Sequence, residues 1–174
     1  MFNIDDIYII RGGGSNFEVD VDDRTTSGET VTIKRGEPVK RDNANFVAPV
    51  ATGDPEIAAD ILVGIATSES NETSADNGVV EVLQILPSTV LRGRANDAAA
   101  INTDAKLLGI KFDYIAFDVA GSPGAITIDE NENDDPNVHG LCVIGGDIVA
   151  GTLDVLVHVN VTLSGSLIGQ TMDA

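Results

Sequence analysis

Two histidines and a single cysteine are the residues in this chain best suited to nucleophilic or zinc chemistry. His139 lies three residues before Cys142, and an imidazole close to a thiol can activate it as a nucleophile. If residues 139–144 form a strand, however, this odd separation places the two side chains on opposite faces. Zinc sites usually take three or four His or Cys ligands, and this chain has three such residues in total, the third being His158. We therefore expect no enzyme activity, no cofactor and no metal here, and interpret Cys142 as a small core residue and His139 as a strand-edge residue.

A run of acidic residues at 129–136 is a second candidate site. Asp129, Asn131 and Asn133 match ligand positions 1, 3 and 5 of a calcium-binding loop. The sixth position holds Asp134 where such loops need glycine, and the preceding pattern predicts a strand instead of a helix. We interpret the run as a solvated acidic hairpin tip. The alternative, a calcium site, predicts a melting temperature that differs between calcium and a chelator.

The net charge argues against binding to nucleic acids or to anionic membranes. The 174 residues include 28 acidic residues and 10 Lys and Arg, which gives a formal net charge of −18. Phosphate neutralisation needs a basic face, which this balance does not favour. The imbalance grows along the chain, because residues 1–41 hold eight acids and six bases, whereas residues 112–174 hold ten acids and no base.

Four of the few basic residues lie within one eight-residue window, at Lys34, Arg35, Lys40 and Arg41. They flank an expected turn at Gly36. Cations in an otherwise acidic chain could contact an acidic partner. The alternative is that all four are solvated side chains.

The hydrophobic pattern has a period of two over most of the chain, as is typical of half-buried antiparallel strands. In the clearest run, Asp154–Leu163, one face carries Val155, Val157, Val159 and Val161. Turns rich in Gly, Pro and Asn separate the apolar runs, so we predict an all-β fold, a small antiparallel β-barrel or sandwich. The other predicted strands are Thr30–Lys34, a short strand containing Val39, Ile61–Thr67, Val79–Leu86, Ile110–Val119, Ala125–Ile128 and Leu141–Ile144.

One segment could be helical. Asn96 or Asp97 could cap a turn that runs through residues 98–101, with Gly109 closing the segment. Weak helix formers at 102–104 interrupt it. A short helix and a loop are therefore both open.

The N-terminal residues differ from the rest of the chain. Residues 1–28 have too few apolar side chains to fold alone, although Ile7–Ile10 can form a strand. We therefore predict an extended N-terminal arm that docks on the body or on a neighbouring subunit. Residues 29–174 then form a β-rich body, which could divide into a small barrel at 29–91 and a second β subdomain at 92–174.

The cellular location follows from three sequence features. Cys142 is alone, so no intrachain disulfide can form. The N-terminus lacks the charged and apolar regions of a signal peptide, and the apolar stretches are far too short to span a bilayer. We expect the protein to be made in a cytoplasm.

Four motifs resemble those of one family of structural proteins. They are the turn Arg35–Val39, the strand Ile61–Ala66, the segment Asp76–Val82 and the hairpin Gly145–Val155. With these motifs the sequence resembles the decoration, or cement, proteins of tailed-bacteriophage heads. In that family a Gly-x-Pro-Val turn, a Val-Gly-Ile-Ala strand and a Gly-led, Val-rich strand recur in a small β-barrel.

The resemblance implies a binding function. Proteins of this kind sit on the outer capsid surface, often as trimers, and stabilise the capsid by bridging major capsid subunits. It therefore implies a virion protein made in the host cytoplasm, with the major capsid protein as partner, self-association as a homotrimer, and no binding to nucleic acid or membrane. The residues expected to contact the capsid or another partner are those of the N-terminal strand and the basic window: Ile7, Tyr8, Ile9, Ile10, Arg11, Lys34, Arg35, Lys40 and Arg41.

Two other functions are open to the same fold class. A β-sandwich carbohydrate-binding or adhesion module would present aromatic platforms to sugars. The chain has only seven aromatic residues, and we expect Phe112, Tyr114 and Phe117 to be buried. A hydrolase that uses paired carboxylates is the third reading, since acidic residues are abundant, but carboxylates in loops are usually only solvated.

Overall fold

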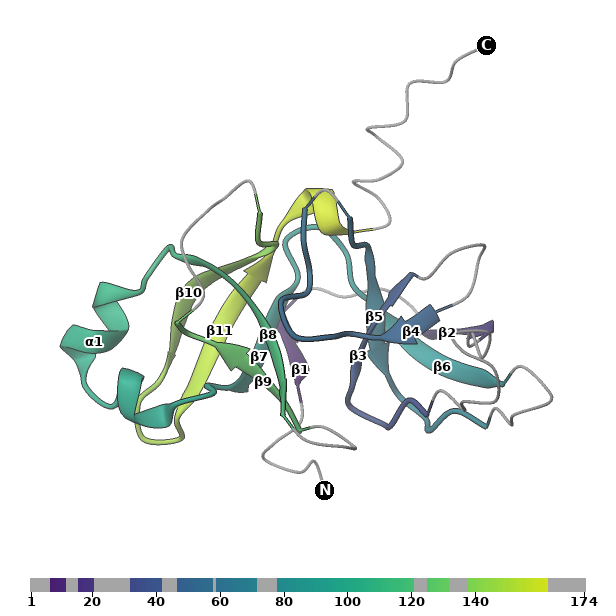
Figure 1. The fold of residues 1–174 in the computed structure, drawn as a ribbon, viewed down its shortest axis with the longest axis horizontal. Coiled ribbons are helices and arrows are strands. Elements are labelled where there is room, and N and C mark those ends of the chain that lie inside the picture. The colour runs from purple at the N-terminus through teal and green to yellow at the C-terminus, as the bar shows by residue number, and fades with distance from the viewer. Residues whose placement is uncertain are drawn as a thin grey trace, which may run out of the picture.

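A computed structural model describes residues 7–11, 16–20, 32–41, 47–57, 59–71, 78–120, 125–131 and 138–162. Within these residues the strands form two antiparallel sheets, which occupy the two halves of the molecule in Figure 1. One sheet has the strand order β1-β7-β11-β10-β8-β9, and the other has the order β2-β6-β5-β3-β4. The predicted all-β fold class is confirmed.

The six-stranded sheet is curled into a half-barrel. Three strands separate β7 from β9 in the strand order, yet Ala95, just after β7, forms a bridge with Ile128 of β9. The amide of Asn96 also donates to the carbonyl of Ile128 at 2.8 Å. The strands are β1 (Tyr8–Arg11), β7 (Val90–Arg94), β8 (Tyr114–Ala120), β9 (Ala125–Asp129), β10 (Leu141–Asp147) and β11 (Thr152–Val157).

The five-stranded sheet is built around β5, whose five residues are all buried. The register between β5 and its neighbour β3 shifts between Val39 and Lys40. Strand β5 supplies side chains to two separate cores. Leu62 and Ile65 belong to the larger core, whereas Val63 and Ala66 belong to the smaller one. The strands are β2 (Asn16–Asp20), β3 (Pro38–Arg41), β4 (Val47–Pro49), β5 (Leu62–Ala66) and β6 (Val79–Gln84).

The larger core joins the two sheets. Phe117 and Leu153 of the six-stranded sheet, both fully buried, belong to the same cluster as Leu62 of β5. The smaller core lies in the half of the molecule that holds the five-stranded sheet, around Ile33, Val39 and Val82. Apart from Phe117, the buried residues of both cores are aliphatic, in keeping with the Trp-free composition.

The helical alternative is correct for residues 98–109. A 3₁₀ helix, η2 (Ala98–Ile101), begins after Asp97, whose side chain accepts the amide of Ala99. The α-helix α1 (Asp104–Gly109) begins after Thr103, whose hydroxyl accepts the amide of Lys106. Two separate caps therefore divide this segment into two short helices, because side-chain oxygens at both positions satisfy amides that have no helical partner.

The predicted strand Asp154–Leu163 is wrong in its second half. Strand β11 ends at Val157, and a 3₁₀ turn, η3 (Val159–Val161), follows. Nδ1 of His158 accepts the amide of Asn160 and so caps this turn. The alternation breaks here, because Val159 is 39% exposed whereas Val161 is fully buried. Leu163 lies outside the described residues.

The predicted strands at 30–34 and 110–119 also need correction. Residues 32–34 are not in a strand, since Ile33 bonds through its amide to the side chain of Ser70 at 2.7 Å, and Thr30 and Val31 lie outside the described residues. Strand β8 begins only at Tyr114, after a turn in which Phe112 has a φ of 76° and is 66% exposed. The expectation that Phe112 is buried is therefore wrong, whereas Phe117 is fully buried.

Candidate functional site

The N-terminal strand β1 lies at one edge of the six-stranded sheet. It pairs with β7, with Tyr8 opposite Arg92 and Ile9 opposite Leu91. The part of the expected arm that the structure describes thus docks on the body of its own chain. Residues 1–6, 12–15 and 21–28 of the expected arm lie outside the described residues.

The expected contact residues of this strand divide by exposure. Ile7 is 2% exposed and belongs to the larger core. Tyr8 and Ile9 are half-buried, while Ile10 and Arg11 are exposed. Ile10, at 42% exposure, and Arg11 are therefore the residues of this group most accessible to a partner.

A pocket of about 180 Å³ lies where β1 faces the five-stranded sheet. It joins the two groups of residues that the sequence proposed as contacts, since residues of β1 form one wall and the turn at Arg35 forms another. The remaining walls come from the end of β5 and from β6. The lining residues are Ile7, Tyr8, Ile9, Arg35, Gly36, Ile65, Ala66, Thr67 and Leu83.

The turn that carries Arg35 is held against the end of β5. Gly36 has a φ of 93°, a left-handed conformation that glycine adopts without strain. Its amide donates to the carbonyl of Ala66 at 2.8 Å, and the amide of Ala66 donates to the carbonyl of Glu37 at 2.9 Å. The Glu37 carboxylate accepts the amide of Lys34 at 2.9 Å, and burial raises the pKa of Glu37. Arg35 is exposed on this fixed turn.

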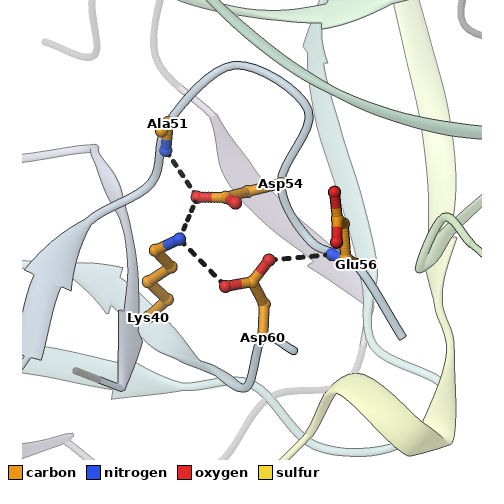
Figure 2. A network of polar contacts seen from close by, with 5 residues as sticks. All are labelled: Lys40, Ala51, Asp54, Glu56 and Asp60. Carbon is orange, nitrogen blue, oxygen red and sulfur yellow. Dashed lines mark hydrogen bonds and ion pairs between the residues drawn. The ribbon is translucent and has the colours of Figure 1, made fainter. Parts of the chain in front are cut away.

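Lys40 is the centre of a network of ion pairs, shown in Figure 2. Its Nζ lies 2.8 Å from Oδ2 of Asp54 and 2.9 Å from Oδ1 of Asp60. Asp54 also accepts the amide of Ala51, and Asp60 accepts the amide of Glu56 at 2.9 Å. The ammonium of Lys40, on β3, is therefore paired within the chain with two carboxylates of the loop that follows β4.

The pKa values in this network shift in different directions. Burial raises the pKa of Asp54, and the bonds from Ala51 and Lys40 do not offset it. Burial acts the same way on Asp60, but the Glu56 amide and Lys40 outweigh it and lower its pKa. Burial alone would lower the pKa of Lys40, but the bonds to both carboxylates raise it. Two carboxylates sharing one ammonium thus differ in acidity.

The other two residues of the basic window lie apart from this network. Arg41 is exposed at the end of β3, next to Lys40, and adjacent strand residues point to opposite faces. Lys34 is half-buried before the turn at Gly36. The four bases are thus divided among different surroundings, and of these four Arg35 lines the pocket.

His139 and Cys142 occupy separate surroundings. His139 is 8% exposed and forms an isolated bridge with Glu56. Cys142 lies in β10 opposite Tyr114 and Leu156. Burial, with a smaller contribution from Asp113, raises the pKa of the Cys142 thiol. A raised pKa disfavours the thiolate, which is the nucleophilic form.

The described part of the acidic run is tied into the fold. Glu130 is 6% exposed, and both of its carboxylate oxygens accept the amide of Asp97 at 3.1 Å. Oδ1 of Asp129 accepts the amide of Asn131 at 3.0 Å. Asn133 and Asp134 lie outside the described residues. Over the part of the chain that the structure covers, no three His, Cys, Asp or Glu side chains gather as a metal site would require.

Comparisons with known family models, with curated proteins and with solved structures find no match to this chain. The resemblance to capsid decoration proteins therefore rests on the sequence motifs given above. Among the described residues, no helix has the length and apolar character needed to cross a membrane.

Three exposed apolar side chains were missed by sequence reasoning. Phe112 and Leu108 are each 66% exposed, and Val149 is 93% exposed at the turn between β10 and β11. Lys111 places its ammonium 5.4 Å from the centre of the Phe112 ring. A bulky residue with positive φ is uncommon, and no turn signal at this position indicated it. These residues are further candidates for contact with a partner.

Proposed function

We propose that this chain is a structural virion protein that binds the outer capsid surface and stabilises the capsid by bridging major capsid subunits. The proposal includes self-association as a homotrimer after synthesis in the host cytoplasm. Its support in the sequence is the resemblance to decoration proteins. Its support in the structure is the pocket, because β1 and Arg35, expected as contacts on separate grounds, line it together.

An exposed sheet edge offers a second means of contact. Among the described strands, β1 has a neighbour on one side only, which is β7. The unpaired backbone groups of such an edge can accept a strand from another chain. Ile10 and Arg11 on β1 offer an exposed apolar and an exposed cationic side chain for the same contact. Several weak contacts of this kind on a trimer add up to firm attachment, because each bound subunit raises the effective concentration of the next.

The proposal is tested by co-sedimentation with expanded capsids assembled from the major capsid protein of the same genome. We expect the wild-type chain to sediment with these capsids and to raise their melting temperature. Ile10→Asp and Arg11→Glu should each weaken binding by at least about tenfold, roughly 1.4 kcal/mol. Val159→Asp and Arg94→Glu, at exposed residues outside β1, are the matched controls for the two exchanges. A wild-type chain that does not sediment with the capsids would overturn the proposal.

A carbohydrate-binding or adhesion module is the alternative, and the exposure of Phe112 favours it. Aromatic faces stack on sugar rings, and the Phe112 ring is largely accessible. Its support is limited to this one ring, with Lys111 close to the ring face. This alternative would be selected if the wild-type chain binds a glycan but not capsids, and if Phe112→Ala abolishes the glycan binding.

A further inference from the structure

We propose that the pocket between β1 and the end of β5 receives one apolar side chain of the protein partner, and that a carboxylate next to that side chain pairs with Arg35. This inference rests on the proposed function and specifies the chemistry of the partner at that contact. The carrying observation is a small, mostly apolar cavity with Arg35 among its lining residues.

The size of the pocket limits what can enter. Its volume is about 180 Å³, and an apolar cavity of roughly 150 Å³ in another protein takes up benzene. Ile9, Ile65 and Leu83 contribute apolar walls. One aromatic ring or one branched aliphatic chain therefore fits, whereas a strand or a helix does not.

The polar groups of the lining select the sign of the neighbouring charge. The guanidinium of Arg35 has five N–H donors in one plane, so it can pair with a carboxylate in addition to the interaction that it already makes. At another wall, the hydroxyl of Thr67 lies 3.5 Å from Oε2 of Glu81. The Glu81 carboxylate would repel a carboxylate of the partner. We therefore place the partner's carboxylate beside Arg35, with its apolar group directed away from Arg35.

The walls are fixed by backbone hydrogen bonds, so the pocket needs little ordering before it binds. Besides the two bonds that hold the Gly36 turn to Ala66, the amide of Thr67 donates to the carbonyl of Glu81 at 2.8 Å. Strand β1 is held by its ladder with β7. A pre-formed site loses less affinity to conformational entropy than a flexible one.

The first experiment uses 3-phenylpropionate as the probe, since it combines one ring with one carboxylate. Amide chemical shifts of the full chain are followed during titration, and 3-phenylpropylamine is the matched probe of opposite charge. We expect saturable shifts at Gly36, Ala66 and Ile9 with millimolar affinity for the acid, and at least tenfold weaker binding of the amine. No saturable shift at these residues, or equal binding of the two probes, would overturn the inference.

Two variants and one control separate the charge from the cavity. Arg35→Gln removes the guanidinium and Thr67→Leu fills the cavity; each should weaken 3-phenylpropionate binding at least tenfold. Arg41→Gln removes an exposed charge that does not line the pocket and should leave binding unchanged. Amide spectra that keep their dispersion identify variants that remain folded. Binding that survives both Arg35→Gln and Thr67→Leu would contradict the assignment.

The same variants distinguish this inference from the proposed function. If capsids bind the wild-type chain and 3-phenylpropionate or Thr67→Leu weakens that binding, the inference holds. If capsids bind the wild-type chain and both pocket variants equally, the inference fails while the proposed function stands. If capsids do not bind the wild-type chain, the proposed function fails, and with it the capsid as the source of the side chain.

Discussion

Nζ of Lys40 on β3 lies 2.9 Å from Oδ1 of Asp60, at the far end of the loop that follows β4. Within that loop, the carbonyl of Asp54 accepts the amide of Phe117 at 2.6 Å, and the amide of Gly53 donates to the carbonyl of Phe117 at 2.9 Å. Phe117 belongs to β8 of the other sheet. The Lys40 network therefore anchors a loop that connects the five-stranded sheet to the six-stranded one.

Replacing Lys40 should destabilise the protein strongly. Lys40→Met leaves two largely buried carboxylates without their cation, and breaking a fully buried pair costs roughly 3–5 kcal/mol. Because the Lys40 side chain keeps 24% exposure, we expect a loss of about 2–3 kcal/mol in the free energy of unfolding. Urea denaturation measures it, with the exposed neighbour in Arg41→Met as the control, expected within about 0.5 kcal/mol of wild type. Equal stability of the two variants would contradict the role of the network.

The two aspartates should respond differently to pH. The pKa of Asp60 is lowered in the fold, so its ionised form adds stability above the unfolded pKa, and this stability is lost as the pH falls through the folded pKa. The pKa of Asp54 is raised, so its ionised form opposes folding at neutral pH. We expect Asp60→Asn to cost more stability than Asp54→Asn at pH 7, and the difference to shrink near pH 3, where carboxyls of ordinary pKa are largely protonated. Urea denaturation at both pH values tests this, and the reverse order at pH 7 would refute it.

The docking of β1 on the body can be tested with a glycine of β7. A Cβ on Gly93 would collide with Cδ1 of Ile7, so Gly93→Ala should lower the free energy of unfolding by about 1–3 kcal/mol. Ile7→Val removes that methyl group, and the double variant should be less destabilised than the sum of the two by about 1 kcal/mol. Gly109→Ala, at the end of α1 with open space around its Cβ, is the control and should be neutral or slightly stabilising. Strict additivity at positions 7 and 93 would argue against the docked position of β1.

Replacing Phe112 with glycine should stabilise the folded protein. Its φ of 76° lies in the left-handed region, which disfavours a bulky side chain by roughly 1–2 kcal/mol, while glycine loses more backbone entropy on folding. We expect Phe112→Gly to gain about 0.5 kcal/mol in thermal or urea unfolding. Ser88→Gly, at a φ of 67°, should show a similar gain and serves as the matched comparison. A loss above about 1 kcal/mol would mean that the ring contributes packing that outweighs the backbone strain.

The predicted arm is better tested by point substitutions than by truncation. Removing residues 1–28 takes away β1 and β2, which pair with β7 and β6, and also removes the buried Ile7. Loss of capsid binding after such a deletion would not separate a missing contact from a damaged fold. Ile10→Asp and Arg11→Glu avoid this problem because both side chains are exposed.

Local sequence pattern was sufficient for strands whose apolar residues repeat without interruption. Strands β5, β6, β9 and β10 follow their apolar runs closely. The same reasoning missed β7, whose sequence is Val-Leu-Arg-Gly-Arg, because its arginines interrupt the apolar pattern. Arg92 forms an ion pair with Asp154 on the adjacent strand, and the local sequence does not indicate this pairing. It also extended β11 through η3, because Val159 and Val161 keep the spacing of two while His158 caps a turn.

The candidate site could be predicted only in part. Residues of β1 and Arg35 were proposed separately, and the pocket that joins them depends on the packing of one sheet against the other. Lys40 was grouped with Arg35 by sequence distance, but its partners Asp54 and Asp60 come from a loop placed by tertiary contacts. Exposure of Phe112 depends on a backbone conformation for which its residue type gives no signal.

The order of strands along the chain has a consequence for synthesis. Strand β1 belongs to the six-stranded sheet, strands β2–β6 build the other sheet, and the chain then returns to the first sheet with β7. On a ribosome, Tyr8 must therefore wait until Arg92 has emerged before it meets its pairing partner. Pairing between residues so distant in sequence slows folding, and an unpaired strand edge is prone to associate with other chains in the meantime. Strand β1 thus stays without its partner until β7 has been made, and the six-stranded sheet can close only after the strands of the other sheet have been made.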